Sequence, residues 1–297
     1  MDLESVRMFV RVADLGSFTR AGEQLGMPKS RVSLRVKELE SEVGSRLLQR
    51  TTRVVRLTLD GEQFLARAKL FVDAADELSA MFQSTSTLRG RVRIDLPIAM
   101  ARDRIIPRLP EFLALHPQLD LVVSTTDRFV DVVREGFDCV LRVGTLTNSG
   151  LVAKRLGVMP MANYASPAYL LKFGTPRTID ELDRHQIVHY SRTLGGDEPC
   201  FEYRRRGRLV TRPVRSVITV NNTDAYNRAC IAGLGIIQAP RYGMEEEVKR
   251  GLVVEVLPDC VSDPMPVSLV HGHGRAVPKR VRAVLTWLTQ VIAPALA

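Results

Sequence analysis

The feature that most constrains the fold of this 297-residue chain is a single change of hydrophobic periodicity near Gly90. Before Gly90, apolar residues recur every three or four positions, which is the spacing of one face of an α-helix. After it, short strand-like runs alternate with helical stretches. A chain of this length also exceeds one ordinary hydrophobic core. The sequence therefore predicts a helical N-terminal part and an α/β C-terminal part.

Three short helices are predicted at the N-terminus. Residues 3–14 have helical spacing, and Ser17, which follows Gly16, fits the N-cap of a second helix. Gly26 ends that helix, and Pro28 fits the first turn of a third. Two helices joined by so short a turn are typical of a helix-turn-helix motif.

The third helix lies in GMPKSRVSLRVKELE (residues 26–40), where cations precede acids although the helix dipole favours the reverse order. Its apolar stripe is expected to face the other two helices and consists of Val32, Val36, Leu39 and Val43. The opposite face carries small hydroxyls, cations and one leucine, which suit base edges, phosphates and thymine methyls. The DNA-binding residues expected on this helix are Lys29, Ser30, Arg31, Ser33, Leu34, Arg35 and Lys37. A solvated surface helix is the alternative interpretation.

A basic hairpin is predicted in RLLQRTTRVVRLTLDG, directly after the third helix. Its strands are expected at residues 47–49 and 54–57, around a tip that contains Arg50, Thr51 and Arg53. A basic tip beside a recognition helix forms a wing whose arginines enter the adjacent minor groove. Residues 1–58 are thus predicted to form a winged helix-turn-helix DNA-binding domain.

A long helix is predicted over residues 59–83, with Thr58 as its N-cap. Apolar residues recur along it in steps of four and three, at Phe64, Ala68, Phe71, Ala75, Leu78 and Phe82. Such a heptad seam favours dimerisation with a second chain, and docking on the chain's own domain is the alternative. STSTLRG then breaks the periodicity, so residues 84–90 are expected to form a flexible hinge.

Residues 91–297 are predicted to form an α/β domain. Strands at RVRIDL, LDLVVST and DCVLRVG, with helices at residues 103–115 and 128–135 between them, imply a parallel sheet covered on both faces. A second block has candidate strands at residues 186–190, 217–220 and 236–238 and a helix that begins near Thr223. PVSLVHG and a helix over residues 278–292 are expected to return to the first block. The subdomains would thus comprise about residues 91–160 with 265–297, and about 161–264.

Composition bounds the function without identifying it. The net charge of +9 favours polyanionic partners. Neither a signal peptide nor an apolar run of membrane-spanning length is evident, so a cytoplasmic location without a membrane partner is expected. Four widely spaced cysteines fit reduced thiols, of which Cys139 and Cys230 are expected in the core. No cofactor is predicted. No metal site is predicted either, because His271 and His273 lack further ligands nearby.

Several stretches together resemble the LysR-type transcriptional regulators over essentially the whole chain. They are FVRVADLGSFTRAGEQLGMPKSRVSLRVKELESEVGSRLLQRTTRVVRLTLDG, HPQLDL, EGFDCVLRVG, ASPAYL and AGLGIIQAP. The resemblance implies a winged helix-turn-helix, a dimerising linker helix and an effector domain shaped like a periplasmic binding protein. It also implies homodimers or homotetramers on double-stranded promoter DNA, with a small-molecule effector between two subdomains. The sequence departs from the family at Met27-Pro28, where Ser or Thr often caps the helix, and at Leu34, where Arg is common.

The effector site is expected where strands end and helices begin. Backbone N–H groups at the loop over residues 97–102 suit a carboxylate, so the hypothesis is an anionic or aromatic-acid effector. The residues expected to contact it are Ala99, Met100, Ala101, Arg102, Arg142, Thr145, Asn222, Thr223 and Gln238. For Thr223 simple N-capping, and for Arg102 simple solvation, are equally good interpretations.

The sequence leaves some alternatives open. A competing class is an α/β solute-binding or catalytic protein whose N-terminal helices serve only in oligomerisation, although the chain lacks GxSxG, P-loop and HExxH motifs and is predicted not to be an enzyme. The basic stretch EYRRRGRLVTRPVR is interpreted as a solvated strand pair with a turn at Gly207 rather than a second nucleic-acid site. A redox role for Cys200 is a further, weaker alternative.

Overall fold

The computed structural model describes the whole chain except residues 51–54, 82–87, 147–149, 275–276 and 297. The chain divides into two compact units. One consists of Met1–Ser86 with Val133–Gly136, and the other of Thr87–Val132 with Phe137–Ala297. We describe each unit by itself.

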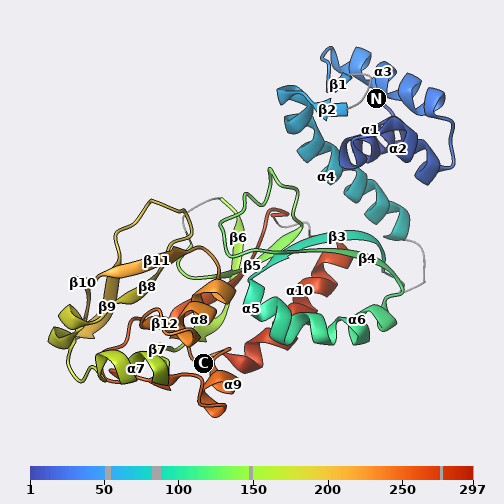
Figure 1. Cartoon of the computed structure of the whole chain (residues 1–297). Helices are drawn as coiled ribbons and strands as arrows, with labels where there is room; N and C mark the ends of the chain where they lie inside the picture. Colours follow the sequence, from blue (N-terminus) through green and yellow to red (C-terminus); the bar gives the residue numbers. More distant parts are fainter. Residues whose placement is uncertain (51–54, 82–87, 147–149, 275–276, 297) are drawn as a thin grey trace. The chain divides into compact units, whose positions relative to one another are not determined.

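The N-terminal unit contains the predicted helix-turn-helix (Figure 1). Its elements are α1 (Leu3–Leu15), α2 (Phe18–Leu25), α3 (Lys29–Val43), β1 (Leu48–Arg50), β2 (Val55–Leu57) and α4 (Leu59–Met81). Both predicted caps are confirmed: the Ser17 hydroxyl accepts a hydrogen bond from the Arg20 N–H, and the Thr58 hydroxyl accepts one from Gly61. β1 and β2 pair antiparallel, as expected for a wing.

Three of the four residues of the predicted α3 stripe are buried. Val32, Val36 and Leu39 have no exposed surface and pack with side chains of α1 and α2. Val43 is 39% exposed, so its assignment to the core is wrong. It is the last residue of α3, and Gly44 ends the helix there in the left-handed conformation.

The α4 seam is divided between two environments. Phe64 meets Phe9 edge to face at 5.3 Å, and Ala68 is 4% exposed within the same core. The expectation that this seam lacks a partner in its own chain is therefore wrong for its first turns, because α1 covers them. Phe71 and Leu78 are 44% and 63% exposed. The predicted seam residue Phe82 lies outside the described residues, as does most of the predicted hinge.

The C-terminal unit contains a five-stranded sheet with the order β4-β3-β5-β14-β6 (Figure 1). These strands are β3 (Arg89–Leu96), β4 (Gln118–Thr125), β5 (Cys139–Val143), β6 (Val152–Met159) and β14 (Met265–His271). β3 pairs parallel with β4 and β5, as predicted, but β14 runs antiparallel to both its neighbours. The sheet is thus mixed rather than parallel. β6 leads out of this sheet and β14 returns to it, so the two neighbouring strands run in opposite directions.

We call the part that contains this sheet, the described residues of 89–132, 137–159 and 265–292, the first lobe. Its buried core includes Ile94, Leu141, Val281 and Leu288, so α10 (Lys279–Ile292) covers one face of the sheet (Figure 1). The helix predicted over residues 103–115 begins earlier and is interrupted. It comprises α5 (Ile98–Met100), a π-helical turn (Ala101–Ile105), a 3₁₀ turn (Ile106–Arg108) and α6 (Leu109–Leu115).

The helix predicted over residues 128–135 is wrong. Turns occupy this segment, and Gly136 ends it with a positive φ of 69°. The carboxylate of Asp127, which precedes this segment, accepts hydrogen bonds from Ile98 and Thr223 and therefore does not cap a helix here.

The second lobe, residues 161–255, holds smaller sheets in the orders β12-β7-β13, β11-β8 and β10-β9. Its strands are β7 (Met161–Ala165), β8 (Ile187–Tyr190), β9 (Cys200–Arg205), β10 (Arg208–Pro213), β11 (Ser216–Val220), β12 (Ile237–Pro240) and β13 (Val254–Glu255). Its helices are α7 (Pro167–Phe173), a 3₁₀ segment (Ile179–Arg184), α8 (Thr223–Ile231) and α9 (Glu245–Lys249). The predicted basic hairpin is confirmed as β9 and β10. Among the described residues, no helix is long and apolar enough to cross a membrane.

Candidate functional site

The outward face of α3 is the first candidate site. Lys29, Ser30, Arg31 and Lys37 are exposed, and Leu34 is 57% exposed. An exposed leucine between cations and a hydroxyl leaves both apolar and polar groups accessible to a ligand along the first turns of one helix.

Two further residues expected on this face are less accessible. Ser33 and Arg35 are half-buried, and Arg35 lies 3.4 Å from Glu38 and 4.0 Å from Asp2. The charge of Arg35 is thus partly balanced within the chain. Arg50 ends β1, whereas its side chain, Thr51 and Arg53 lie outside the part that the structure describes.

The acids at the end of α3 have a structural role. The Glu40 carboxylate accepts hydrogen bonds from the backbone N–H groups of Leu47 and Leu48, at 3.0 and 2.9 Å. These bonds attach the first strand of the wing to the third helix. The order of charges along α3 therefore has two parts. Cations lie on the exposed early turns, and a carboxylate near the end of the helix holds the strand that follows.

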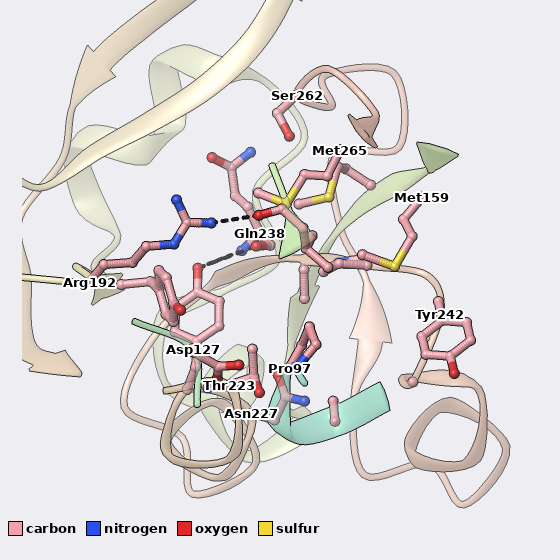
Figure 2. A pocket seen from close by; sticks show the side chains of 18 of the residues that line it. Pro97, Asp127, Met159, Arg192, Thr223, Asn227, Gln238, Tyr242, Ser262 and Met265 are labelled. Carbon is pink, nitrogen blue, oxygen red and sulfur yellow. Dashed lines mark hydrogen bonds between the residues drawn. The ribbon is translucent and has the colours of Figure 1, made fainter. Parts of the chain in front are cut away.

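The second candidate site is a cavity of about 290 Å³ between the two lobes of the C-terminal unit. Apolar side chains make up much of its wall, among them Pro97, Leu141, Met159, Met161, Ile236 and Met265. Figure 2 shows Asp127, Thr223 and Asn227 gathered at one end, with Met159 and Met265 at the other. A largely apolar wall with a few converging polar groups is typical of a small-molecule site.

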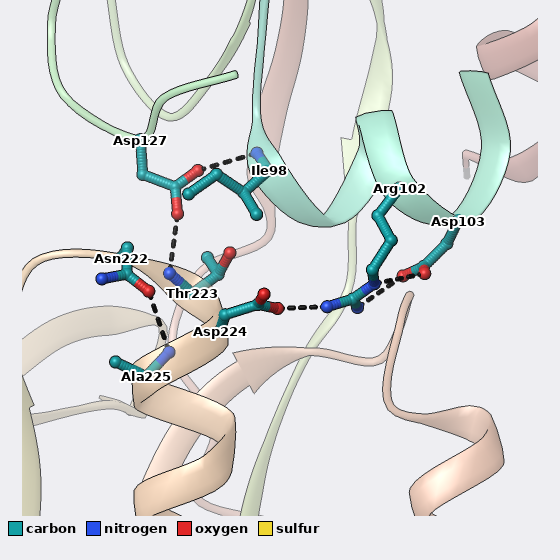
Figure 3. A network of polar contacts seen from close by, with 8 residues as sticks. All are labelled: Ile98, Arg102, Asp103, Asp127, Asn222, Thr223, Asp224 and Ala225. Atoms are coloured by element: carbon teal, nitrogen blue, oxygen red, sulfur yellow. Dashed lines mark hydrogen bonds and ion pairs between the residues drawn. The ribbon is translucent and has the colours of Figure 1, made fainter. Parts of the chain in front are cut away.

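Asp127 joins the two lobes at the polar end of the cavity (Figure 3). Its carboxylate accepts hydrogen bonds from the backbone N–H of Ile98, at 3.1 Å, and of Thr223, at 2.6 Å. One donor of the loop over residues 97–102, the N–H of Ile98, thus already donates to the chain's own Asp127.

A buried ion pair lies under the cavity. The Arg142 guanidinium donates through Nη1 to Asp95 at 2.8 Å, and the Thr126 hydroxyl bonds the same carboxylate at 3.2 Å. Asp95 has no exposed surface and Arg142 is 7% exposed. Arg142 Nη2 is buried and has no hydrogen-bond partner among the described residues. Arg142 is also one of the residues that line the cavity.

Two more buried polar atoms at the cavity have no partner in the described part of the chain. They are the Thr223 hydroxyl and His189 Nε2. Arg192, by contrast, is held: its Nη2 donates to the Val143 carbonyl at 3.0 Å, and its guanidinium stacks 4.5 Å from the centre of the Phe129 ring. This contact also joins the second lobe to the first.

Burial keeps a phenol and a thiol of the wall protonated at pH 7. Burial raises the pKa of Tyr190 to about 12, and Asp127 adds to that shift. Burial, followed by Glu202 and Asp197, raises the pKa of the Cys200 thiol. A protonated thiol is a poor nucleophile, which weighs against a redox role for Cys200.

Five of the nine predicted effector residues line the cavity: Ala99, Met100, Arg142, Thr223 and Gln238. The side-chain amide of Gln238 is occupied, because Nε2 donates to Asn163 and to the Glu202 carbonyl and Oε1 accepts from the Glu202 N–H. Gln238 therefore supports the wall and has little capacity left for a ligand.

The other four predicted residues lie outside the cavity wall and are corrected. Ala101 is fully buried in the core of the first lobe, and Thr145 is exposed. The Asn222 side chain caps α8 by accepting from the Ala225 N–H at 2.8 Å. Arg102 pairs instead with Asp103 and Asp224, as Figure 3 shows.

Sequence analysis missed Asp95, Asp127, His189 and Arg192. An acid inside the apolar strand RVRIDL indicates a buried partner, so the role of Asp95 could have been predicted from the sequence. Asp127 follows a strand end, but its partner Thr223 is 96 residues away. Among the described residues, no group of His, Cys, Asp and Glu is arranged to hold a metal.

Comparisons with known proteins extend over both units. The family model for the bacterial regulatory helix-turn-helix protein, lysR family, matches residues 3–62, and the one for the LysR substrate binding domain matches residues 85–293. The chain is 40% identical to the uncharacterized HTH-type transcriptional regulator YhjC of Escherichia coli, over 98% of this chain and 97% of that protein.

Solved structures show the same architecture. CrgA, a LysR-type transcriptional regulator from Neisseria meningitidis, is 28% identical, with a TM-score of 0.61 over 98% of each chain. The Vibrio cholerae virulence activator AphB is 24% identical and shares the fold, with a TM-score of 0.59 over 98% of this chain and 99% of that one. With a matching DNA-binding domain, a matching effector domain and full-length relatives, this chain belongs to the LysR family of transcriptional regulators, which bind promoter DNA and small-molecule effectors.

Proposed function

We propose that the exposed face of α3 reads promoter DNA and that the cavity between the lobes holds the effector that changes this binding. The observation that carries the first half is the exposure of Leu34 beside Ser30 and Lys37. Short polar groups reach base edges, and an aliphatic side chain contacts thymine methyls. Lys29, Arg31 and Lys37 bind phosphates along the groove.

The wing and the long helix complete this assignment. Arg50, Thr51 and Arg53 contact the minor groove beside the recognition helix. The later part of α4, with exposed Phe71 and Leu78 and half-buried Ala75, pairs with the same helix of a second copy. Such a dimer presents two recognition helices to two half-sites of an operator.

The proposal that the cavity holds the effector rests on the cavity itself and on its unpartnered donors. The cavity wall comes from both lobes, and ties such as Asp127 to Thr223 cross between them. A ligand that binds one lobe arrangement more tightly shifts the population toward it, and this is the energetic condition for regulation. We place no reaction in the cavity. The protein acts in the cytoplasm, where promoter DNA is found.

The DNA half is tested by fluorescence anisotropy on the DNA that flanks the protein's own gene. Leu34→Ala and Ser30→Ala are compared with Val248→Ala, a partly exposed apolar residue of α9. We expect the first two to lose roughly tenfold in preference for this DNA over a scrambled duplex. Unchanged preference in both variants refutes the assignment of this face.

The effector half is tested by a thermal-shift screen of small metabolites. Ala99→Trp, which fills the cavity from its wall, serves as the comparison. Compounds that bind the cavity stabilise the parent protein and lose this effect in the variant. A hit that stabilises both proteins equally binds elsewhere.

A further inference from the structure

Asp127 occupies a position that is suited to an external anion. Its two carboxylate oxygens accept from the N–H groups of Ile98 in the first lobe and Thr223 in the second, as Figure 3 shows. Free backbone N–H groups where helices begin attract carboxylates and phosphates. In this chain the anion is supplied from within, by a side chain at the end of β4.

The wall beside Asp127 offers donors whose charge is already balanced. Arg142 is 7% exposed, forms an ion pair with Asp95 and keeps Nη2 without a partner among the described residues. The Thr223 hydroxyl is buried and unpartnered at the same cavity. A buried donor without an acceptor costs free energy, which a ligand oxygen relieves.

The charges around the cavity cancel. Among the described residues of its wall, Arg128, Arg142 and Arg192 are opposed by Asp127 and Glu202. Asp95 beneath the wall neutralises the remaining cation. An additional charge brought into this largely apolar space therefore enters without a counter-ion, which is unfavourable.

We infer that Asp127 is a specificity-determining residue: it fills the anion position between the lobes, so the effector is an uncharged molecule whose oxygen accepts from Arg142. This inference rests on the proposed role of the cavity as the effector site. The effector's apolar body lies against the methionine-rich end, and a carboxylate on it meets the negative charge of Asp127.

The test removes the internal carboxylate and offers an external one. Asp127→Gly opens space for formate between the same two N–H groups, and Asp120→Gly removes an exposed acid of β4 that pairs only at the surface with Arg91. Thermal unfolding is followed with sodium formate against sodium chloride at equal ionic strength. We expect formate at several times its Kd to raise the Tm of Asp127→Gly by roughly 2–4 °C, and to leave the parent and Asp120→Gly unchanged.

A second arm keeps the inference testable if Asp127→Gly fails to fold. Asp127→Asn preserves the side-chain shape but turns an amide N–H toward a backbone N–H, so its Tm falls and formate does not restore it. The parent protein supplies an independent check, because acetate and benzoate should not stabilise it more than chloride does.

Two results overturn the inference: stabilisation of the parent by formate, acetate or benzoate, or equal responses of Asp127→Gly and Asp120→Gly to formate. Failure of the proposed function is distinguishable from these. If every compound found in the thermal-shift screen stabilises Ala99→Trp as much as the parent protein, the cavity is not the effector site. The response of Asp127→Gly to formate then still shows whether Asp127 occupies an anion position.

Discussion

The Arg142 guanidinium lies 2.8 Å from the carboxylate of Asp95, and both side chains are buried at the cavity between the lobes. The pair joins β3 to β5 in the middle of the sheet. Its position explains how a charged residue comes to line a largely apolar space. The charge is balanced by Asp95, and Nη2 of the guanidinium is left without a hydrogen-bond partner among the described residues.

Breaking this pair should destabilise the C-terminal unit. Asp95→Asn leaves Arg142 charged and without its counter-ion in a buried position, which costs about 3–5 kcal/mol. The double variant Asp95→Asn with Arg142→Met removes both charges and should recover most of that loss. Urea unfolding measures both effects, and a loss below about 1 kcal/mol in Asp95→Asn contradicts the pairing.

The two parts of α4 should respond differently to substitution. Leu78→Glu places a charge on the exposed part of the seam, so we expect it to dissociate the assembly with little effect on the N-terminal core. Phe64→Ala removes the ring that contacts Phe9 and should lower the free energy of unfolding by about 2 kcal/mol, less than for a fully buried ring. Sedimentation and thermal unfolding separate the two outcomes. Intact assemblies of Leu78→Glu would show that this seam does not pair.

The stability of the second lobe should fall in mild acid. Burial lowers the pKa of His185 below its ordinary value of 6.5, with Glu181 opposing in part, and its Nδ1 lies 3.1 Å from the Tyr169 hydroxyl. Because the unfolded chain binds the proton first, the free energy of unfolding decreases as pH falls through about 6.5 toward the folded-state pKa. His185→Gln should flatten this dependence in urea titrations. Burial of His271 acts in the same direction, so some slope remains, but an unchanged slope contradicts the account.

The thiols should react slowly and unequally. Burial raises the pKa of Cys230 to about 12 and also raises that of Cys139, so neither should react with iodoacetamide while the protein is folded. Cys200 and Cys260 are half-buried, and burial raises the pKa of each. Mass spectrometry after alkylation at neutral pH should find only these two modified, more slowly than free cysteine. Rapid modification of Cys200 would revive the redox alternative.

The features of the fold and of the candidate sites that could be predicted are those encoded by residues close together in the sequence. The first three helices were predicted because each has a periodic stripe and its own boundary residues, such as Ser17 and Gly26. The antiparallel direction of β14 has no local signal, since it depends on where the chain returns from the second lobe. The function of Asp127 was hidden for the same reason: its partners lie 29 and 96 residues away. Fold class and the exposed face of α3 are therefore readable from sequence, whereas the cavity depends on contacts between distant segments.

The most direct test of the central claim, that the exposed face of α3 binds duplex DNA, is the salt dependence of operator binding. The logarithm of the binding constant falls linearly with the logarithm of salt concentration, by about 0.9 per phosphate contact. Lys37→Ala should therefore reduce the slope by about 0.9, whereas Lys249→Ala, in the C-terminal unit, should leave it unchanged. Identical slopes for the parent, Lys37→Ala and Lys29→Ala would contradict the claim.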